Sequence, residues 1–252
     1  MSGTVRGSFE GQTAVVTGGT RGIGAAVVEA LLAAGARVHA TYRSNEEAAR
    51  AFGDRQAAHA ERLALHRFDV ADYAAVERFW RELGEREPGG VQVLVSNAGL
   101  RRDAILALMK PEQWNAVIGA NLTGSFHMSR FAVQSMLRGR YGRIVLVTSP
   151  AASHGFAGQA NYSASKAGQI GMMRSLAREV ARKGITANCV SPGFVGTELL
   201  ADLDEEQKKE HLARVPAGRF GRPEEIAWAV LALASREASY VNGAVLEVTG
   251  GL

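Results

Sequence analysis

Cysteine is almost absent from this chain. Cys189 is the one cysteine among 252 residues, so neither an internal disulfide nor a metal site built from several cysteines can form. Long apolar runs are missing too, because no stretch reaches the roughly 18 apolar residues that a transmembrane helix needs. The first twelve residues are polar and carry no apolar run followed by a cleavage site. We therefore expect a soluble cytoplasmic protein with no membrane partner and no bound metal.

Clustered charge is also lacking. The net charge is +4 and the sequence pI is about 9.5, but the basic residues are spread along the chain, which argues against nucleic acid as a partner. Dispersed positive charge fits a phosphate-bearing small molecule or an acidic protein equally well. No Pro/Ser-rich linker interrupts the composition, so we expect residues 1–252 to form a single domain.

Seven short, β-branched and nearly continuous apolar segments alternate with longer segments of helical periodicity. This pattern is typical of parallel strands that crossover helices cover on both faces. We expect an α/β fold of the Rossmann type, a doubly wound parallel sheet of about seven strands with helices on both faces. The expected strands are Ala14–Thr17, Arg37–Thr41, Ala64–Phe68, Val91–Val95, Arg143–Thr148, Thr186–Val190 and Val245–Val248.

A glycine-rich loop follows the first expected strand. Thr17-Gly-Gly-Thr-Arg-Gly-Ile-Gly24 leads into an Ala/Val/Leu-rich helix that ends near Ala34. Glycines at 18, 22 and 24 leave no Cβ where backbone amides and a helix N-terminus must approach a pyrophosphate. Such glycines also serve tight turns, but the strand, turn and helix that a dinucleotide site requires are all present.

The end of the second expected strand favours a phosphorylated cofactor. An NAD site carries an acidic residue about 20 residues beyond the glycine loop, whereas this chain has Arg43 there. Arg43, together with Arg21 in the loop, can pair with a 2′-phosphate, which predicts NADPH/NADP+ as the cofactor. In the alternative interpretation both arginines are solvated surface residues.

Two further strand ends carry candidate cofactor contacts. Asp69-Val70 follows the third expected strand, and Ser96-Asn-Ala-Gly99 follows the fourth. Open α/β sheets bind ligands at the carboxyl ends of their strands, so contacts to adenine and ribose are expected here. Each segment also suits an ordinary strand-terminating turn.

Ser149, Tyr162 and Lys166 form the candidate catalytic group. Tyr162 stands 13 residues after Ser149, and Lys166 follows it by four on an expected helix, Asn161–Val180, so the two share a face. A neighbouring ammonium lowers a tyrosine pKa from near 10 toward neutrality, which would let Tyr162 exchange a proton with a carbonyl oxygen held by Ser149. Taken alone, such a pair is usually only a surface pair.

Jointly, the motifs resemble the short-chain dehydrogenase/reductase family, and within it the 3-oxoacyl-acyl-carrier-protein reductase branch. The resemblance covers nearly the whole chain. The matching segments are Thr17–Gly24, Asn97–Gly99, Asn121-Leu-Thr-Gly124, Ser149, Tyr162-Ser-Ala-Ser-Lys166, Ser191-Pro-Gly193 and Val248-Thr-Gly-Gly251.

The resemblance implies an NADPH-dependent ketoreductase. In the implied mechanism NADPH gives hydride to the ketone carbon, Tyr162 gives the proton and Ser149 stabilises the developing alkoxide. Lys166 lowers the tyrosine pKa and contacts the nicotinamide ribose, while Asn121 supports a water that links Lys166 to solvent. The implied substrate is a 3-oxoacyl thioester, bound to an acyl carrier protein, in fatty-acid or polyketide biosynthesis.

The motifs and the resemblance together give a set of cofactor contacts and a lid. A mobile substrate lid is expected over Glu198–Arg219, although its composition suits a static surface helix equally well. The expected cofactor contacts are Gly18, Thr20, Arg21, Gly22, Ile23, Gly24, Arg43, Asp69, Val70, Asn97, Ala98, Gly99, Tyr162, Lys166, Pro192, Gly193, Val195 and Thr197.

Partner contacts are also implied by the resemblance. Arg140 and Lys183 match positions at which the family presents arginines to the acidic carrier, and near the cleft they would attract it. Cations at helix ends are common for dipole reasons alone. The resemblance further implies a homotetramer, with the Ala132–Met136 region and the helix of Lys166 at one interface and the C-terminal strand at another.

Two alternatives stay open. The chain fits an NAD(P)-dependent dehydrogenase of a small alcohol, sugar or steroid with the same tetrad, or a non-catalytic nucleotide-binding subunit. The intact Ser149, Tyr162 and Lys166 argue against the second. Pro150 and His154 in the substrate loop depart from the usual pattern and are expected to reshape acyl selectivity, with Pro150 stiffening the loop through its fixed φ.

Overall fold

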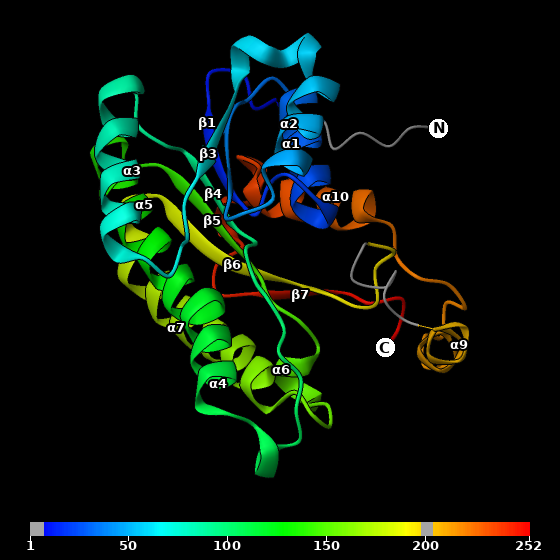
Figure 1. The fold of residues 1–252 in the computed structure, drawn as a ribbon. Helices are drawn as coiled ribbons and strands as arrows, with labels where there is room; N and C mark the ends of the chain where they lie inside the picture. Colours follow the sequence, from blue (N-terminus) through cyan, green and yellow to red (C-terminus); the bar gives the residue numbers. More distant parts are fainter. Residues whose placement is uncertain (1–7, 198–203) are drawn as a thin grey trace.

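A single parallel sheet organises the molecule (Figure 1). The computed structural model describes residues 8–197 and 204–252. The sheet has seven strands in the order β3-β2-β1-β4-β5-β6-β7, and every neighbouring pair is parallel. The strands are β1 (Thr13–Thr17), β2 (Arg37–Tyr42), β3 (Leu63–Arg67), β4 (Val93–Ser96), β5 (Gly142–Val147), β6 (Ile185–Pro192) and β7 (Val245–Val248). The predicted fold class is confirmed, and each expected strand is present with ends displaced by at most two residues.

The chain reverses its direction across the sheet between β1 and β4. It runs outward from β1 through β2 to β3, and then returns to place β4 on the other side of β1. The connections that leave the carboxyl ends of β1 and β4 therefore diverge, and a crevice opens between them. This is the edge at which the expected site residues meet.

Helices cover both faces of the sheet (Figure 1). The helices α1 (Gly22–Ala33), α2 (Glu46–Arg55) and α10 (Pro223–Ala234) pack on one face, and α3 (Tyr73–Arg86), α5 (Gly124–Gly139) and α7 (Ala160–Val180) pack on the other. None of the helices in the described part of the chain is long and apolar enough to cross a membrane. The shorter elements are α4 (Pro111–Val117), α6 (Ala151–His154), α9 (Glu205–Ala213), a π-helical turn at Ile118–Thr123, and 3-10 turns at Ala57–Arg62, Leu106–Leu108, Ala181–Lys183 and Glu237–Tyr240.

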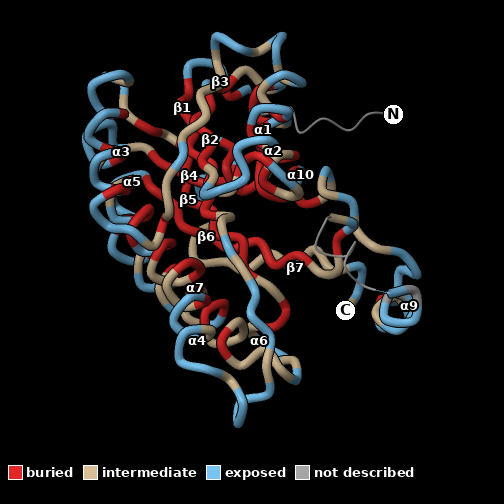
Figure 2. Tube along the Cα trace, in the orientation of Figure 1, coloured by how far each residue is buried: buried red, intermediate tan, exposed pale blue. Residues whose placement is uncertain are grey.

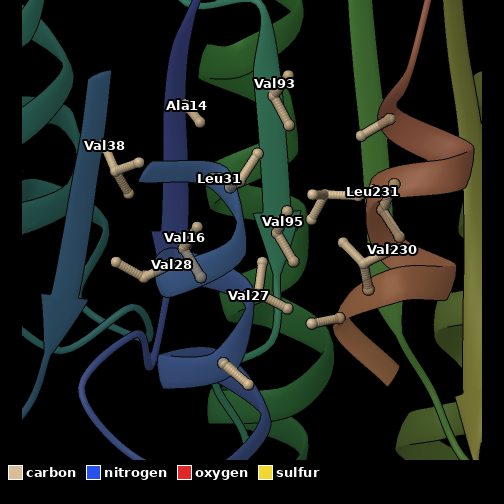
Figure 3. Close-up of a cluster of buried hydrophobic side chains, with 14 of the residues drawn as sticks. Ala14, Val16, Val27, Val28, Leu31, Val38, Val93, Val95, Val230 and Leu231 are labelled. Carbon is tan, nitrogen blue, oxygen red and sulfur yellow. The ribbon is translucent and has the colours of Figure 1, made fainter. Parts of the chain in front are cut away.

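The core on the α1 side shows how helices bury one face of the strands, and a second core lies on the opposite face. Val16 and Val95 of the sheet lie against Leu31 of α1 and Val230 of α10, and all four are fully buried (Figure 3). Each such side chain contributes about 1.5–3 kcal/mol when it leaves water. Burial is deepest along the strands and falls toward the outer helix surfaces (Figure 2).

Two sequence expectations change in detail. The composition of Glu46–Ala60, rich in Ala, Glu and Arg, also predicts a helix; its α-helical part ends at Arg55, and the 3-10 turn Ala57–Arg62 follows. In the Ala132–Met136 region, Ala132 and Met136 are buried in the core beneath α5. Their side chains face the sheet of their own chain, so an interface at this region would use its exposed side chains, such as Gln134, and stays a prediction.

Two histidines connect β2 and β3 beneath α3. His39 Nδ1 lies 3.0 Å from His66 Nε2, and His39 Nε2 lies 3.3 Å from Glu87 Oε1. The two rings stack with centroids 5.2 Å apart, and the His66 ring packs edge-on against Phe79. Burial lowers the pKa of His66 to about 4, and the neighbouring His39 and Arg86 act in the same direction. Burial also lowers the pKa of His39, against the opposing effect of Glu87. The pair is therefore neutral in the folded protein at neutral pH.

We expect the free energy of unfolding to fall as the pH drops from about 6.5 toward 4. Unfolded His66 takes up a proton near its usual pKa of about 6.5, whereas folded His66 stays neutral until about pH 4. The unfolded state binds more protons in this window, so acid destabilises the fold. Urea unfolding at pH 7 and at pH 5 gives the free energy of unfolding at each pH. The decrease in this free energy between pH 7 and pH 5 should be smaller in His66→Asn than in the original protein. The exposed His154→Asn is the control, and an unchanged loss in His66→Asn contradicts the assignment.

Candidate active site

A cavity of about 620 Å³ lies at the carboxyl ends of β1 to β4. Gly18 and Gly22 adopt φ values of 62° and 51° in the loop between β1 and α1. A Cβ added at Gly18 would stand 3.2 Å from the Cα of Ala98, so the loop passes tightly over the end of β4. Of the expected cofactor contacts, the cavity is lined by Gly18, Thr20, Arg21, Gly22, Ile23, Arg43, Asp69, Val70, Asn97, Ala98, Gly99 and Thr197.

Gly24 is not among the lining residues of this cavity. A Cβ added at Gly24 would stand 2.1 Å from the carbonyl oxygen of Gly18 and 2.6 Å from Nδ2 of Asn97. The glycine therefore lets the first turn of α1 pack against the loop. Its expected cofactor contact stays a prediction.

Thr17 and Asn97 fasten the glycine loop to the neighbouring strand. Thr17 Oγ1 accepts hydrogen bonds of 2.9 Å from the backbone amides of Asn97 and Ala98. Asn97 Nδ2 donates back to the carbonyls of Thr17 and Gly18 at 3.0 and 3.2 Å. The role of the Thr17 side chain was not predicted from the sequence, because it depends on the pairing of β1 with β4.

An acidic side chain lies next to Arg43 at the end of β2, where the sequence predicts none. No acidic residue follows β2 directly, but the parallel neighbour β3 brings Asp69 alongside, with Oδ2 3.8 Å from Arg43 Nη1. Both side chains are substantially exposed, so this ion pair is weak. Arg21 lines the same cavity. Thr41, Tyr42, Ser44, Asn45 and Phe68 also line it, and the sequence reasoning missed them.

A second cavity of about 420 Å³ contains the candidate catalytic group. Ser149 follows β5, Tyr162 and Lys166 project from α7, and all three line it. The expected contacts Pro192, Gly193, Val195 and Thr197 line its side next to β6. The two cavities adjoin, because both are lined by Ile23, Asn97, Gly99, Leu100 and Thr197.

Tyr162 and Lys166 do not interact as the sequence predicts. The Lys166 Nζ donates a 2.7 Å hydrogen bond to the carbonyl of Val147 and lies 5.6 Å from the centroid of the Tyr162 ring. Burial lowers the pKa of Lys166 to about 8 and raises that of Tyr162, against which a hydrogen bond from Ser149 acts only in part. The expectation of a tyrosine pKa near neutrality is therefore wrong for this structure, because burial outweighs the nearby charges.

Asn121 lies in the π-helical turn between α4 and α5 and is fully buried. Its Oδ1 accepts from the amide of Leu100 at 2.8 Å, and its Nδ2 donates to the carbonyl of Leu100 at 3.1 Å. A Cβ added at Gly99 would lie 3.2 Å from Asn121 Oδ1 and 3.8 Å from Lys166 Nζ. Asn121 thus fixes the loop after β4 close to the lysine.

A buried polar chain supports Asn121 from below. Gln169 Nε2 donates 2.8 Å hydrogen bonds to the carbonyl of Asn121 and to Oγ of Ser125. Asn121 Nδ2 also donates to Oγ of Ser165, which in turn donates to the carbonyl of Tyr162 at 2.7 Å. The role of Gln169 was not predicted from the sequence. Its position three residues after Lys166, on the same face of α7, was the one available indication.

The outer part of the second cavity is where a substrate can enter. His211 and Arg214, in and just after α9, line it, and the His211 ring lies 4.6 Å from that of Phe194. The expected lid therefore reaches the site through these two residues, whereas 198–203 lie outside the described residues. Pro150 also lines the cavity. His154 does not, and its Nδ1 lies 3.2 Å from the carbonyl of Pro150.

Arg140 and Lys183 lie at the opposite edge of the sheet from the candidate site. Arg140 precedes β5, and its guanidinium donates to the carbonyl of Arg182 at 3.4 Å. Lys183 lies seventeen residues beyond Lys166, at the end of the turn that continues α7, which is about 25 Å at a helical rise of 1.5 Å per residue. The expectation that they flank the cleft is wrong within one chain, and their carrier-docking role stays a prediction.

Several known proteins similar to this chain are reductases. A family model described as enoyl-(acyl carrier protein) reductase matches residues 18–252. The chain is 46% identical over 245 residues to a 3-oxoacyl-[acyl-carrier-protein] reductase of Escherichia coli K12, covering 97% of this chain and 98% of the relative. The corresponding reductase of Vibrio cholerae is 44% identical over the same shares. An acetoacetyl-CoA reductase of Shinella zoogloeoides is 43% identical over 241 residues, covering 95% and 98%.

Proposed function

The chain belongs to the short-chain dehydrogenase/reductase family, and we propose that it reduces a 3-oxoacyl thioester to the 3-hydroxyacyl thioester with NADPH. The observation that carries the proposal is the junction of the two cavities at Gly99 and Thr197. If the glycine loop holds the pyrophosphate of a dinucleotide, the nicotinamide ring at its other end would reach this junction beside Ser149 and Tyr162. The named activities of the relatives, on carrier-bound and CoA-bound thioesters, support the substrate class.

The first cavity fits a nicotinamide dinucleotide. Gly18 and Gly22 have positive φ and no Cβ, and they open the N-terminus of α1 toward the cavity, where its dipole favours a pyrophosphate. Arg21 and Arg43 would hold the 2′-phosphate that distinguishes NADPH from NADH. The segment Pro192–Thr197 would hold the nicotinamide end. When bound, the cofactor supplies the hydride for the ketone carbon.

Tyr162 is the proposed proton donor. Burial holds its pKa above the usual value, so the phenol is protonated at neutral pH and can pass its proton to the carbonyl oxygen as that oxygen gains charge. Ser149 would donate a hydrogen bond to the same oxygen. Lys166, with a pKa lowered to about 8, is poised to return a proton to the phenolate, and Asn121 fixes the loop that borders both.

The acyl carrier protein is the proposed partner, and we also propose that the chain forms a homotetramer. Large apolar side chains remain exposed on the outer face of α5 and beside the C-terminal strand, at the two places where the family likeness puts subunit interfaces. Phe126 and Leu137 lie on α5, Trp228 lies on α10, which packs beside β7, and Tyr240 lies in the turn that precedes β7. Exposed aromatic side chains of this kind mark protein interfaces.

Replacing Tyr162 by Phe should lower turnover about 10²–10⁴-fold, the usual contribution of a general acid. The assay follows NADPH absorbance with acetoacetyl-CoA and longer 3-oxoacyl thioesters. Tyr73→Phe, on α3 and outside both cavities, is the matched control and should keep full activity. Turnover retained in Tyr162→Phe would exclude Tyr162 as the donor. If a sugar or a steroid is reduced and no thioester is, the proposed substrate class is wrong.

Arg43→Gln should raise the KM for NADPH about tenfold and leave the KM for NADH nearly unchanged. The reason is that the lost guanidinium would contact only the 2′-phosphate, and one charge-assisted hydrogen bond is worth about 1.5–3 kcal/mol. Steady-state kinetics with both cofactors measure the change. Arg50→Gln on the exposed face of α2 is the control. An equal rise for both cofactors would mean that Arg43 does not read the phosphate.

A further inference from the structure

Arg101 lines the catalytic cavity beside Tyr162 but belongs to none of the groups assigned above. It follows Leu100, whose amide and carbonyl are both held by Asn121. Its backbone position is therefore fixed by the same side chain that fixes the loop near Lys166. Arg101 is partly exposed, so its charged group lies between the cavity and solvent.

A carboxylate and the substrate loop hold the Arg101 side chain in place. Its guanidinium forms a two-armed ion pair with Asp103, through Nη2 and Oδ2 and through Nε and Oδ1. Gln159 Nε2 donates to the same carboxylate at 3.1 Å, and the amide of Ala104 donates to the carbonyl of Gly158 at 2.9 Å. The loop after β4 and the loop before α7 are thereby joined at the cavity mouth.

Stability of the fold does not account for this ion pair. The side chains of Arg101 and Asp103 are 41% and 39% exposed, and exposed pairs of this kind contribute only about 0–1 kcal/mol. An arginine keeps its charge at every pH at which the protein is folded. Its fixed place beside the catalytic phenol therefore gives it a lasting electrostatic effect there.

The charges of this pair act on Tyr162 in opposite directions. Burial is the largest influence and raises the pKa of Tyr162, while Arg101 lowers it and Asp103 raises it. The effect is mutual, because Tyr162 in turn raises the pKa of Arg101. Opposite effects on one phenol are a property that can be measured.

Other ionisable groups around Tyr162 contribute less to its charge balance. Lys166, on the same helix, turns its ammonium to the Val147 carbonyl. Cys189 of β6, behind it, has a pKa raised to about 12 by burial and stays neutral. On the α9 side, burial lowers the pKa of His211, so its ring is neutral at the alkaline pH values of this test. Arg214 forms an ion pair with Glu210.

We propose that Arg101 and Asp103 are a positioning pair that acts through Tyr162, with Arg101 stabilising the phenolate left by proton transfer and Asp103 limiting that stabilisation. The proposal rests on the proposed function, in which the Tyr162 hydroxyl gives its proton to the carbonyl oxygen of the substrate and becomes a phenolate. A buried anion is costly unless a cation lies near it. Asp103 acts in the same direction as burial, which keeps the phenol protonated at the start of each turnover.

The test compares the pH profiles of kcat for thioester reduction in two single variants. Loss of the Lys166 proton gives a first decline in kcat near pH 8, and the protonated phenol that reduction requires gives a second alkaline limb at the higher pKa of Tyr162, which is the limb to follow. Arg101→Gln should move this alkaline limb upward by about half a pH unit to one unit, and Asp103→Asn should move it downward by a similar amount. The double variant should lie between the two. Arg102→Gln, exposed and outside the cavity, is the matched control and should leave the limb in place.

A merely structural role gives a different result. Both single variants break the same ion pair, so a structural clamp would change both profiles in the same direction, and the double variant would match the singles. Either that result or an unmoved limb in both variants overturns the proposal.

A measurement without turnover separates this proposal from the proposed function. The ¹³Cζ resonance of Tyr162, assigned with Tyr162→Phe, reports its ionisation in the free protein. Its midpoint should be higher in Arg101→Gln and lower in Asp103→Asn. If the original protein reduces no thioester, the proposed function fails, and this titration still decides whether the pair acts on Tyr162.

Discussion

The parallel alignment of β1, β4, β5 and β6 is the constraint on which the site depends. Parallel strands end at one edge of the sheet, so the four loops that follow them are delivered to the same place. They supply the glycine loop, the Asn97–Leu100 segment, Ser149 and the Pro192–Thr197 segment. The return of the chain from β3 to β4 opens the crevice between the first two. A slip of one strand would separate groups that contact one another only across strands, such as Thr17 and Asn97.

Burial of polar groups then sets the chemistry at this edge. Asn121, Ser165 and Gln169 are fully buried, and Lys166 is 3% exposed. Hydrogen bonds among them and to backbone carbonyls offset most of the loss of water, while Gln169 Oε1 has no partner among the described residues. The same burial lowers the pKa of Lys166 and raises that of Tyr162. The site therefore begins with a protonated phenol and a lysine that exchanges its proton near neutral pH.

Much of this organisation could be predicted from the sequence. The strands were predictable because they are buried on both faces and are therefore continuously apolar, and the glycine loop and the Ser149, Tyr162 and Lys166 group are local patterns. The contacts of Thr17 and Gln169 were not predictable, since they depend on which strand and helix become neighbours. The predicted direction of the Tyr162 pKa shift was wrong, because the shift depends on burial rather than on the spacing to Lys166. Arg140 and Lys183 were misplaced because their helices run away from the cleft, a direction that a motif does not reveal.

Transfer of hydride from the cofactor to the ketone carbon is the central claim, and an isotope measurement tests it most directly. The protein is incubated with acetoacetyl-CoA and NADPH that carries deuterium at both C4 positions of the nicotinamide, and the product is analysed by mass spectrometry. The account predicts a 3-hydroxybutyryl thioester with one deuterium on the carbon that bore the ketone. A hydroxy product without that deuterium, or no product under conditions in which the cofactor binds, would contradict it.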